Sequence, residues 1–198
     1  MSEVKDFKFD KMALSYDTGL KGKVLKRFYK LLISQIEIAE DAVVLDVGCG
    51  TGSILKMMSE IADIDGYGID IEENMINEAK QKCPSMNIQI SNCNDTPFEN
   101  SKFDIITVCL AFHHFADKKG FAQEAVRILK PDGHLYITDP KFPVVIRKPV
   151  NLAFRIHRIA GYFGSSKELA AYFDEFGLSL LSVTSDKYAQ CLTLQKVS

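Results

Sequence analysis

Three glycines and one carboxylate that could bind a polar ligand lie together in one stretch, VVLDVGCGTG, over residues 43–52. Gly48, Gly50 and Gly52 directly follow a short apolar run rich in β-branched side chains, which predicts a buried parallel strand ending in a glycine turn. Glycine lets a ligand approach the backbone closely because it has no Cβ. A helix is expected from about residue 53 to 61, so N–H groups at its start would meet the polar tail of a ligand.

The spacing of the glycines and the acid before them indicate the kind of ligand. A dinucleotide-binding turn reads G-x-G-x-x-G, whereas here the third glycine comes one residue early and is followed by Ser53. Asp46 lies at the end of the strand, where its carboxylate would repel a pyrophosphate but could bind an ammonium group, directly or through water. These residues therefore favour a nucleoside with an amino-acid tail. The alternative is a tight turn that binds nothing.

A second carboxylate, Asp70, comes eighteen residues after Gly52, at the tip of the next expected strand. An acid at about this distance from a glycine turn is typical of one that holds the two hydroxyls of a ribose. A carboxylate suits that task because it accepts two strong hydrogen bonds at once. The alternative is that Asp70 caps the following helix, EENMINEAKQKC. Beside the glycine turn, ribose binding is the favoured interpretation.

Strand and helix signals alternate along the middle of the chain, which predicts a parallel sheet with crossover helices. The expected strands fall at 43–47, within 62–71, and at 86–90, 103–110 and 134–138, and a K-P-D-G stop signal precedes the last of them. Two further runs, 178–184 and 188–197, are too close for a crossover helix and should pair as an antiparallel hairpin at one sheet edge. The fold class is therefore α/β, a Rossmann-like three-layer sandwich with a mostly parallel seven-stranded sheet.

Ligands of such sheets bind beyond the carboxyl ends of the strands. Polar or backbone groups suited to binding fall at five of these ends: Asp46, Asp70, Asn92, Leu110 and Asp139. Because parallel strands bring their ends to one edge, these groups should lie close together.

Length and composition point to one domain covering residues 1–198, with ordinary globular composition and a net charge of −2. This charge argues against a broad nucleic-acid-binding face. No run is long enough for a membrane span and the first residues lack a signal-peptide core, so a cytoplasmic location is expected without stable membrane insertion. The domain divides into four expected segments: an N-terminal lid and helix at 1–38, a ligand-binding core at 39–140, a helical cap insertion at 141–164, and a C-terminal helix and hairpin at 165–198.

The five cysteines are scattered and odd in number, with no C-x-x-C pair. They are interpreted as reduced thiols that form neither a disulfide framework nor a metal site. A nucleophilic role would need a low thiol pKa, for which the sequence gives no sign.

The cap insertion is cationic. Residues 141–158 contain Lys141, Arg147, Lys148, Arg155 and Arg158 and no acid, and the apolar piece from 150 to 163 is expected to be helical. The favoured interpretation is a cap helix with solvated charges, and the alternatives are contact with a membrane surface, a partner or an anionic substrate.

Four stretches taken together resemble one known family. VLDVGCGTG (44–52), GIDI (68–71), FDIITVCLAFHHF (103–115) and RILKPDGHLYITDP (127–140) are similar, in order and spacing, to class I S-adenosylmethionine-dependent methyltransferases. The nearest likeness is to the small-molecule group similar to the quinone-biosynthesis methyltransferases. The resemblance covers about residues 40–140, and FDKMALSYD (9–17) looks like the start of that group.

The resemblance implies S-adenosyl-L-methionine as the cofactor and a role for each matching position. Asp46 and the turn would hold the methionine end, Asp70 the ribose, Ile71 and Met75 the adenine, and the Leu110 carbonyl the region near the methionine moiety. Relatives often carry D-A-x-x-L-P-F after the third strand, where this chain has Asn92 and Cys93; the uncharged amide still offers an acceptor to the adenine amino group, and Asp95 could substitute. The implied cofactor residues are Asp46, Gly48, Cys49, Gly50, Gly52, Asp70, Ile71, Met75, Asn92, Cys93 and Leu110.

The implied activity is direct in-line transfer of a methyl group to a small or medium-sized acceptor. A hydroxyl or ammonium acceptor needs a base, and His113 and His114 lie just past the fourth strand. The alternative for this pair is structural, with one ring packed and one solvated. Further candidates are Tyr16 as a lid residue, which could instead be a packed surface aromatic, and His157 and Asp139.

Other classes of protein remain open at this stage. The chain could be a non-catalytic cofactor-binding module or partner subunit, and it could form a homo-oligomer. Ser53 and Asp46 argue against a nicotinamide-dependent oxidoreductase. A nucleic-acid methyltransferase rests on the cations of 141–158 alone, and LAFHH stands where an N-P-P-Y motif would follow the fourth strand.

Overall fold

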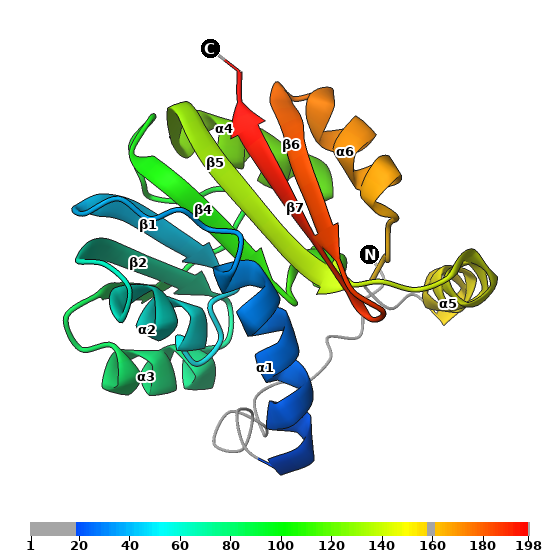
Figure 1. Cartoon of the computed structure of the whole chain (residues 1–198), viewed down its shortest axis with the longest axis horizontal. Coiled ribbons are helices and arrows are strands. Elements are labelled where there is room, and N and C mark those ends of the chain that lie inside the picture. Colours follow the sequence, from blue (N-terminus) through cyan, green and yellow to red (C-terminus); the bar gives the residue numbers. More distant parts are fainter. Residues whose placement is uncertain (1–18, 158–160, 198) are drawn as a thin grey trace.

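The structure is a computed structural model that describes residues 19–157 and 161–197. A seven-stranded sheet with the order β3-β2-β1-β4-β5-β7-β6 forms its centre (Figure 1). The first five strands run parallel, and β7 is antiparallel to both of its neighbours. The strands are β1 (Ala42–Val47), β2 (Ile64–Asp70), β3 (Asn87–Ile90), β4 (Phe103–Cys109), β5 (Leu129–Pro140), β6 (Leu178–Ser185) and β7 (Ala189–Lys196).

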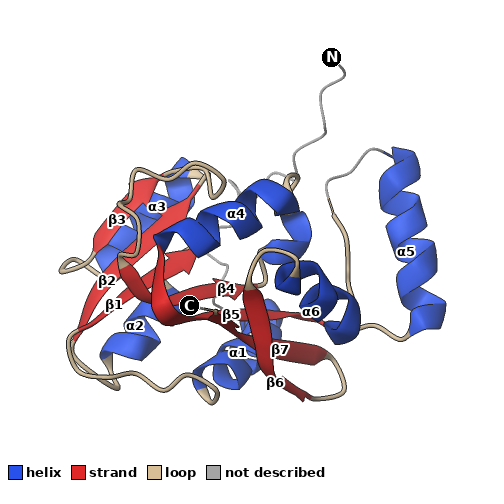
Figure 2. Cartoon of the chain, turned by 90° about the horizontal axis from the view of Figure 1, so that it is seen from above, coloured by secondary structure: helices blue, strands red, loops and turns tan. Residues whose placement is uncertain are grey.

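Helices cover both faces of this sheet (Figures 1 and 2), because its central strands are apolar on both sides. On one face α1, α2 and α3 pack on a buried cluster that includes Leu32, Leu55 and Ile76. On the other face α4 and α6 pack on a cluster that includes Phe121 and Phe173. The helices are α1 (Gly19–Ile33), α2 (Ser53–Ser59), α3 (Glu73–Lys82), the 3-10 turn η2 (Phe112–His114), α4 (Lys118–Ile128), α5 (Val144–His157) and α6 (Ser166–Asp174).

The predicted fold class is confirmed: the sheet is mostly parallel, has seven strands and ends in the expected C-terminal hairpin. β5 is longer than the predicted 134–138. It starts at Leu129, which pairs with Phe103, and the register then jumps to the pair of Ile105 and His134. The K-P-D-G turn signal therefore forms a bulge within the strand, with Asp132 at a positive φ of 62°.

The helical part of the cap insertion begins earlier than predicted, at Val144 instead of 150, and contains Pro149. A proline inside a helix removes one backbone hydrogen bond. Two tethers offset this loss, one on each side of the proline: Arg147 forms an ion pair with Glu168, and the Asn151 side chain both donates to and accepts from the Phe163 backbone at 2.9 Å. Tertiary contacts thus hold a helix that the local sequence disfavours.

Candidate active site

A cavity of about 700 Å³ lies at the carboxyl ends of the parallel strands. Its walls come from the glycine turn after β1, the end of β2, the loops after β3 and β4, and Phe154 of α5. This is the edge at which open α/β sheets bind ligands. Ten of the predicted cofactor residues line it: Asp46, Gly48, Cys49, Gly50, Asp70, Ile71, Met75, Asn92, Cys93 and Leu110.

The glycine turn has the geometry that requires glycine. Gly48 and Gly50 have φ angles of 69° and 50°, a region that side chains disfavour. A Cβ at Gly48 would lie 2.6 Å from the Ala111 Cβ, so the turn packs tightly against the loop after β4. A Cβ at Gly50 would meet nothing within 4 Å, because Gly50 faces the open cavity.

The N–H groups of the turn already have partners within the chain. Those of Gly48 and Cys49 donate to the Ile69 carbonyl at 2.8 and 3.0 Å, and that of Gly50 donates to Asp70 Oδ2 at 2.9 Å. We expected amides free to meet a ligand. The structure instead uses them to join the turn to β2, so any of these three amides would have to exchange partners before it contacts a ligand.

Asp70 joins the glycine turn to the start of α3. One carboxylate oxygen accepts the Gly50 N–H, and the other accepts the Glu72 N–H at 3.0 Å. Glu72, not Asp70, holds the N-cap position of α3, so the alternative of Asp70 as the helix cap is wrong; Asp70 instead holds the backbone of the N-cap residue. The carboxylate also lines the cavity, and each oxygen has a further lone pair with which to accept a hydroxyl.

Asp46 is a buried carboxyl at the floor of the cavity. Thr107, its neighbour across β1 and β4, donates a hydrogen bond to it at 2.7 Å. Burial raises the pKa of Asp46 to about 7, partly offset by the Thr107 hydrogen bond, and the nearby charge of Asp70 adds to the rise. A cationic group in the cavity would favour the ionised form of this carboxyl.

The charges of the cavity favour a cationic ligand. Among the described residues that line it, four carry a carboxyl group and none is a lysine or an arginine. The four are Asp46, Asp70, Glu72 and Asp117. A concave site lined by one sign of charge concentrates ligands of the opposite sign.

Two apolar side chains lie next to Asp70, where the resemblance implies an adenine. Met75 is buried, whereas Ile71 is 67 % exposed, so a flat apolar ligand would cover it. Beyond them, the Asn92 side chain accepts the Asn94 N–H at 3.0 Å and lines the cavity. Asp95, the suggested substitute for an acid at this place, is not among the lining residues.

Leu110 directly follows β4, which ends one residue earlier than expected, and has a φ of 58°, in the left-handed region that costs a bulky residue about 1–2 kcal/mol. Its N–H donates to the Thr138 carbonyl at 2.8 Å, which holds the strained backbone in place. Strain of this kind concentrates at functional sites, and Leu110 lines the cavity.

The cysteines of the site are not reactive thiolates. Burial raises the pKa of Cys93 to about 12, and it raises the pKa of Cys49 and Cys109 well above the ordinary value. All five cysteines are free thiols. Their surroundings are those of packed side chains, not nucleophiles.

The two adjacent histidines have different environments. His114 lines the cavity, and burial lowers its pKa to about 4, helped by the nearby charges of His113 and Lys118. His113 is buried behind it: its Nδ1 lies 2.8 Å from Asp139 Oδ1, and its ring stacks on Phe163 with 4.8 Å between ring centroids. The two imidazole centroids are 4.0 Å apart.

Several predicted residues lie away from the cavity lining. Gly52 caps α2, with no room for a Cβ against Ala79 at 3.2 Å, and His157 is exposed at the end of α5. His113 is also absent from the lining, while Tyr16 lies outside the described residues.

Sequence reasoning missed several residues of the site, three aromatic residues and a threonine among them. Tyr29, Phe115 and Phe154 line the cavity, and Thr107 holds Asp46. A polar residue inside the apolar run FDIITVC could have drawn attention to Thr107. The aromatic residues had no such signal, because their contribution depends on how α1, α5 and the loop after β4 pack.

Comparisons with known proteins agree with this geometry. The family model "Methyltransferase domain" matches residues 45–137. A demethylmenaquinone methyltransferase of Chlorobaculum tepidum is 27 % identical over 169 residues, which cover 80 % of this chain and 70 % of the relative. A S-adenosylmethionine-dependent methyltransferase of Aquifex aeolicus has a TM-score of 0.71 at 24 % identity, covering 97 % of this chain and 100 % of its own. The methyltransferase chain of the Haloferax volcanii complex with the Trm112 methyltransferase activator has a TM-score of 0.82 at 19 % identity, covering 99 % and 100 %.

The chain is thus similar to the class I S-adenosylmethionine-dependent methyltransferases, by the domain matched at residues 45–137, by its sequence relatives and by its fold. Within that class its sequence relatives include the methyltransferases of quinone biosynthesis. The cofactor is S-adenosyl-L-methionine, and the cavity suits it: the carboxylates match a sulfonium and an ammonium, and Asp70 matches a ribose diol.

Proposed function

We propose that this chain transfers a methyl group from S-adenosyl-L-methionine to a small or medium-sized acceptor, directly and in line. One observation supports this most: a single cavity is lined both by the carboxylates of Asp46 and Asp70 and by the rings of His114, Phe115 and Phe154. We assign the carboxylates of Asp46 and Asp70 to the cofactor, and the three rings to the acceptor.

The cofactor-binding roles follow from the contacts around each residue. Asp70 would accept the ribose hydroxyls while it keeps its bonds to Gly50 and Glu72. Asp46, held by Thr107, would face the ammonium of the methionine end. Asn92 and the apolar Met75 would border the adenine.

When bound, S-adenosyl-L-methionine supplies a methyl group that its sulfonium already activates. The chain's own task is to hold the acceptor in line and to exclude water, and such positioning can contribute roughly 7–11 kcal/mol to lowering the barrier. Phe115 and Phe154 would help both to position the acceptor and to exclude water, because they are apolar side chains that line the cavity.

We assign contact with the acceptor to His114, which lines the cavity. With a pKa lowered to about 4, it is neutral at pH 7. A neutral imidazole adds no positive charge beside a sulfonium and can accept a hydrogen bond from a hydroxyl or amine of the acceptor. The same low pKa makes it a weak general base, so we assign it a positioning role before a proton-accepting one.

His113 would support His114 from behind. Its pairing with Asp139 fixes the orientation of its ring, which in turn packs against the His114 ring. A role of His113 as the base itself would need access to the cavity, which His113 does not line.

The proposal is tested by supplying radiolabelled cofactor together with fractionated pools of small molecules and following transfer of the label. Labelled product with the wild-type chain, and at least tenfold less with His114→Ala, is the expected result. Binding of S-adenosylhomocysteine to both proteins serves as the control, because His114 is assigned to the acceptor side.

Tight cofactor binding without transfer to any pool would instead support the alternative of a non-catalytic cofactor-binding module. The expectation of a homo-oligomer stays a prediction, which light scattering of the purified chain would check.

A further inference from the structure

Helix α5 exposes apolar side chains and buries polar ones, the reverse of the usual pattern for a helix on the surface of a globular protein. Besides Phe154, which lines the cavity, its inward face carries two polar side chains: Arg147 is 6 % exposed, and Asn151 is hydrogen-bonded to the Phe163 backbone. Its outward face carries apolar ones, since Val145 is 79 % exposed and Ile156 is 65 % exposed. A helix that only caps the site would bury its apolar side chains and expose its polar ones.

The exposed apolar side chains form one stripe. Val145, Pro149, Leu152 and Ile156 follow one another at intervals of four, three and four residues, which places them on one face of a helix. Phe154, the α5 residue that lines the cavity, falls on the opposite face. A ligand in the cavity therefore does not cover the stripe.

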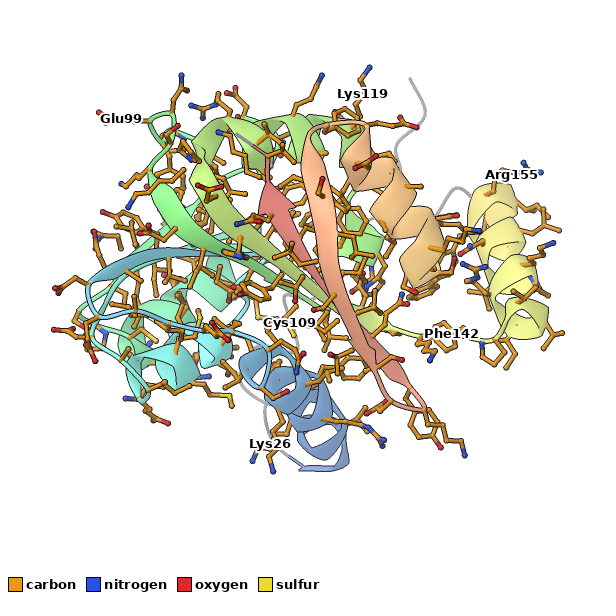
Figure 3. All side chains as sticks on the ribbon, turned by 45° about the horizontal axis from the view of Figure 1, so that its top comes forward. Lys26, Glu99, Cys109, Lys119, Phe142 and Arg155 are labelled. Carbon is orange, nitrogen blue, oxygen red and sulfur yellow. The ribbon has the colours of Figure 1, made fainter. Side chains whose placement is uncertain are left out.

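Positive charges flank this stripe. Lys148 and Arg155 are exposed and lie along one side of it, one helical turn before and after its middle. From Lys141 to Lys167 the sequence contains no acid. Figure 2 shows α5 standing off from the sheet at one end of the molecule, and Figure 3 places Arg155 on the part of α5 far from Phe142.

We infer that α5 docks the protein on the surface of a bilayer that contains anionic lipids, with this stripe among the acyl chains and its cations among the head groups. An apolar stripe bordered by Lys and Arg is the pattern of helices that lie in the membrane interface. The helix lies on the membrane and does not cross it: over the described residues, no helix is long and apolar enough to span a bilayer. This inference goes beyond the proposed methyl transfer and does not depend on it.

Two other occupants fit the stripe less well. A second copy of the chain would bring the cations of one α5 against those of the other, with no acid in either segment to pair with them. A different protein would need more surface than one stripe of four side chains, because a standard interface uses about 20–30 residues from each side. A bilayer has no such minimum, and its anionic head groups complement Lys148 and Arg155.

The test is co-sedimentation of the full chain with phosphatidylcholine vesicles that contain or lack phosphatidylglycerol. We expect binding to the anionic vesicles and release at high salt, since exposed charges are screened. Lys148→Gln with Arg155→Gln should weaken this binding by about 25-fold, or fivefold for each cation.

The apolar stripe is tested by Val145→Glu with Ile156→Glu, which should lower vesicle binding at least tenfold. The matched control is Leu181→Glu with Val183→Glu on β6, where the side chains are also exposed, at 54 % and 40 %. This control makes the same change in charge and should bind as the wild type does. Thermal unfolding of both variants should match the wild type, because all four side chains already face solvent.

Three results would overturn the inference. The first is no binding of the wild-type chain to anionic vesicles at low salt. The second is equal loss of binding in the α5 and β6 variants. The third is a wild-type dimer that the α5 variant converts to a monomer in light scattering, which would make a second copy the occupant of the stripe.

Discussion

At the scale of single residues, Asp70 carries the largest share of the proposed cofactor binding. Its two oxygens hold the glycine turn and the start of α3 in place, and the same oxygens face the cavity. It therefore orders the site as well as offering a charge to the ligand. Replacement by asparagine keeps the size and removes the charge, and its NH2 group can no longer accept one of the two backbone N–H bonds.

Asp70→Asn should weaken binding of S-adenosylhomocysteine by about 1.5–3 kcal/mol, the range for hydrogen bonds to a charged group. Calorimetry measures this loss. Asp65→Asn, on the same strand but bonded to the Tyr67 hydroxyl outside the cavity, is the control and should bind normally. Unchanged affinity in Asp70→Asn would remove this residue from the site.

The raised pKa of Asp46 predicts that cofactor binding depends on pH. With a pKa of about 7, its carboxyl gains its charge as the pH rises through 7, and only the charged form attracts an ammonium. Affinity for S-adenosylhomocysteine should therefore increase with pH from 6 to 8, by at most about tenfold per unit. Asp46→Asn should bind weakly and without this slope; a slope that persists in the variant would assign the titration to another group.

The stability of the ligand-free chain should change with pH in the direction opposite to that of cofactor affinity. The pKa of Asp46 is raised from 3.8 in the unfolded chain to about 7 in the fold. Its contribution to the free energy of unfolding is therefore fully present below pH 4 and is lost as the pH rises toward 7. Chemical denaturation of wild type and Asp46→Asn across this range would reveal the difference between them.

Among the structural elements, the glycine turn contains one glycine that matters for stability, Gly48, and one that matters for ligand binding, Gly50. Gly48→Ala should destabilise the fold, because the new Cβ meets Ala111 at 2.6 Å. Gly50→Ala should cost only about 1–2 kcal/mol for its positive φ, since nothing lies within 4 Å of its Cβ. Yet its methyl group projects into the cavity and should impair cofactor binding. Denaturation and calorimetry on both variants check this, and normal binding by Gly50→Ala would place the ligand elsewhere.

The attachment of α5 depends on the buried guanidinium of Arg147, which pairs with Glu168 at the start of α6. Glu168→Gln keeps the capping box that Glu168 forms with Ser165, because glutamine serves at this position, but removes the ion pair. We expect a loss of about 1–2 kcal/mol in unfolding free energy, less than for a fully buried pair because Glu168 is half exposed. Glu175→Gln, exposed at the other end of α6, should change little.

In the whole molecule, the mostly parallel sheet, its C-terminal hairpin and the edge that carries the cavity followed from the sequence alone. Periodicity and the glycine turn predicted them, because local patterns determine all three. The start of α5 at Val144 could not be predicted from the sequence, because Pro149 disfavours a helix there. The contacts of Arg147 and Asn151 that stabilise this helix come from distant parts of the chain. The hydrogen bonds that occupy the amides of the turn could not be predicted either, because the Gly50 N–H meets Asp70 only when β1 and β2 lie side by side.

The different positions of His113 and His114 could not be predicted from the sequence either. Sequence placed His113 and His114 after β4 but gave no way to say which ring faces the cavity. That depends on Asp139 from β5 and Phe163 from the cap, which hold His113 away from it. The four-part division of the chain stays a prediction, and limited proteolysis at the borders of 141–164 would check it.

The central claim is that one cavity holds both ends of a single sulfonium nucleoside, with Asp70 at the ribose and Asp46 at the amino-acid tail. Calorimetric titration of the folded chain with S-adenosylhomocysteine tests it most directly. We expect saturable binding at one site per chain, weakened by a change at either carboxylate. A flat titration, or binding that survives the loss of both carboxylates, would contradict it.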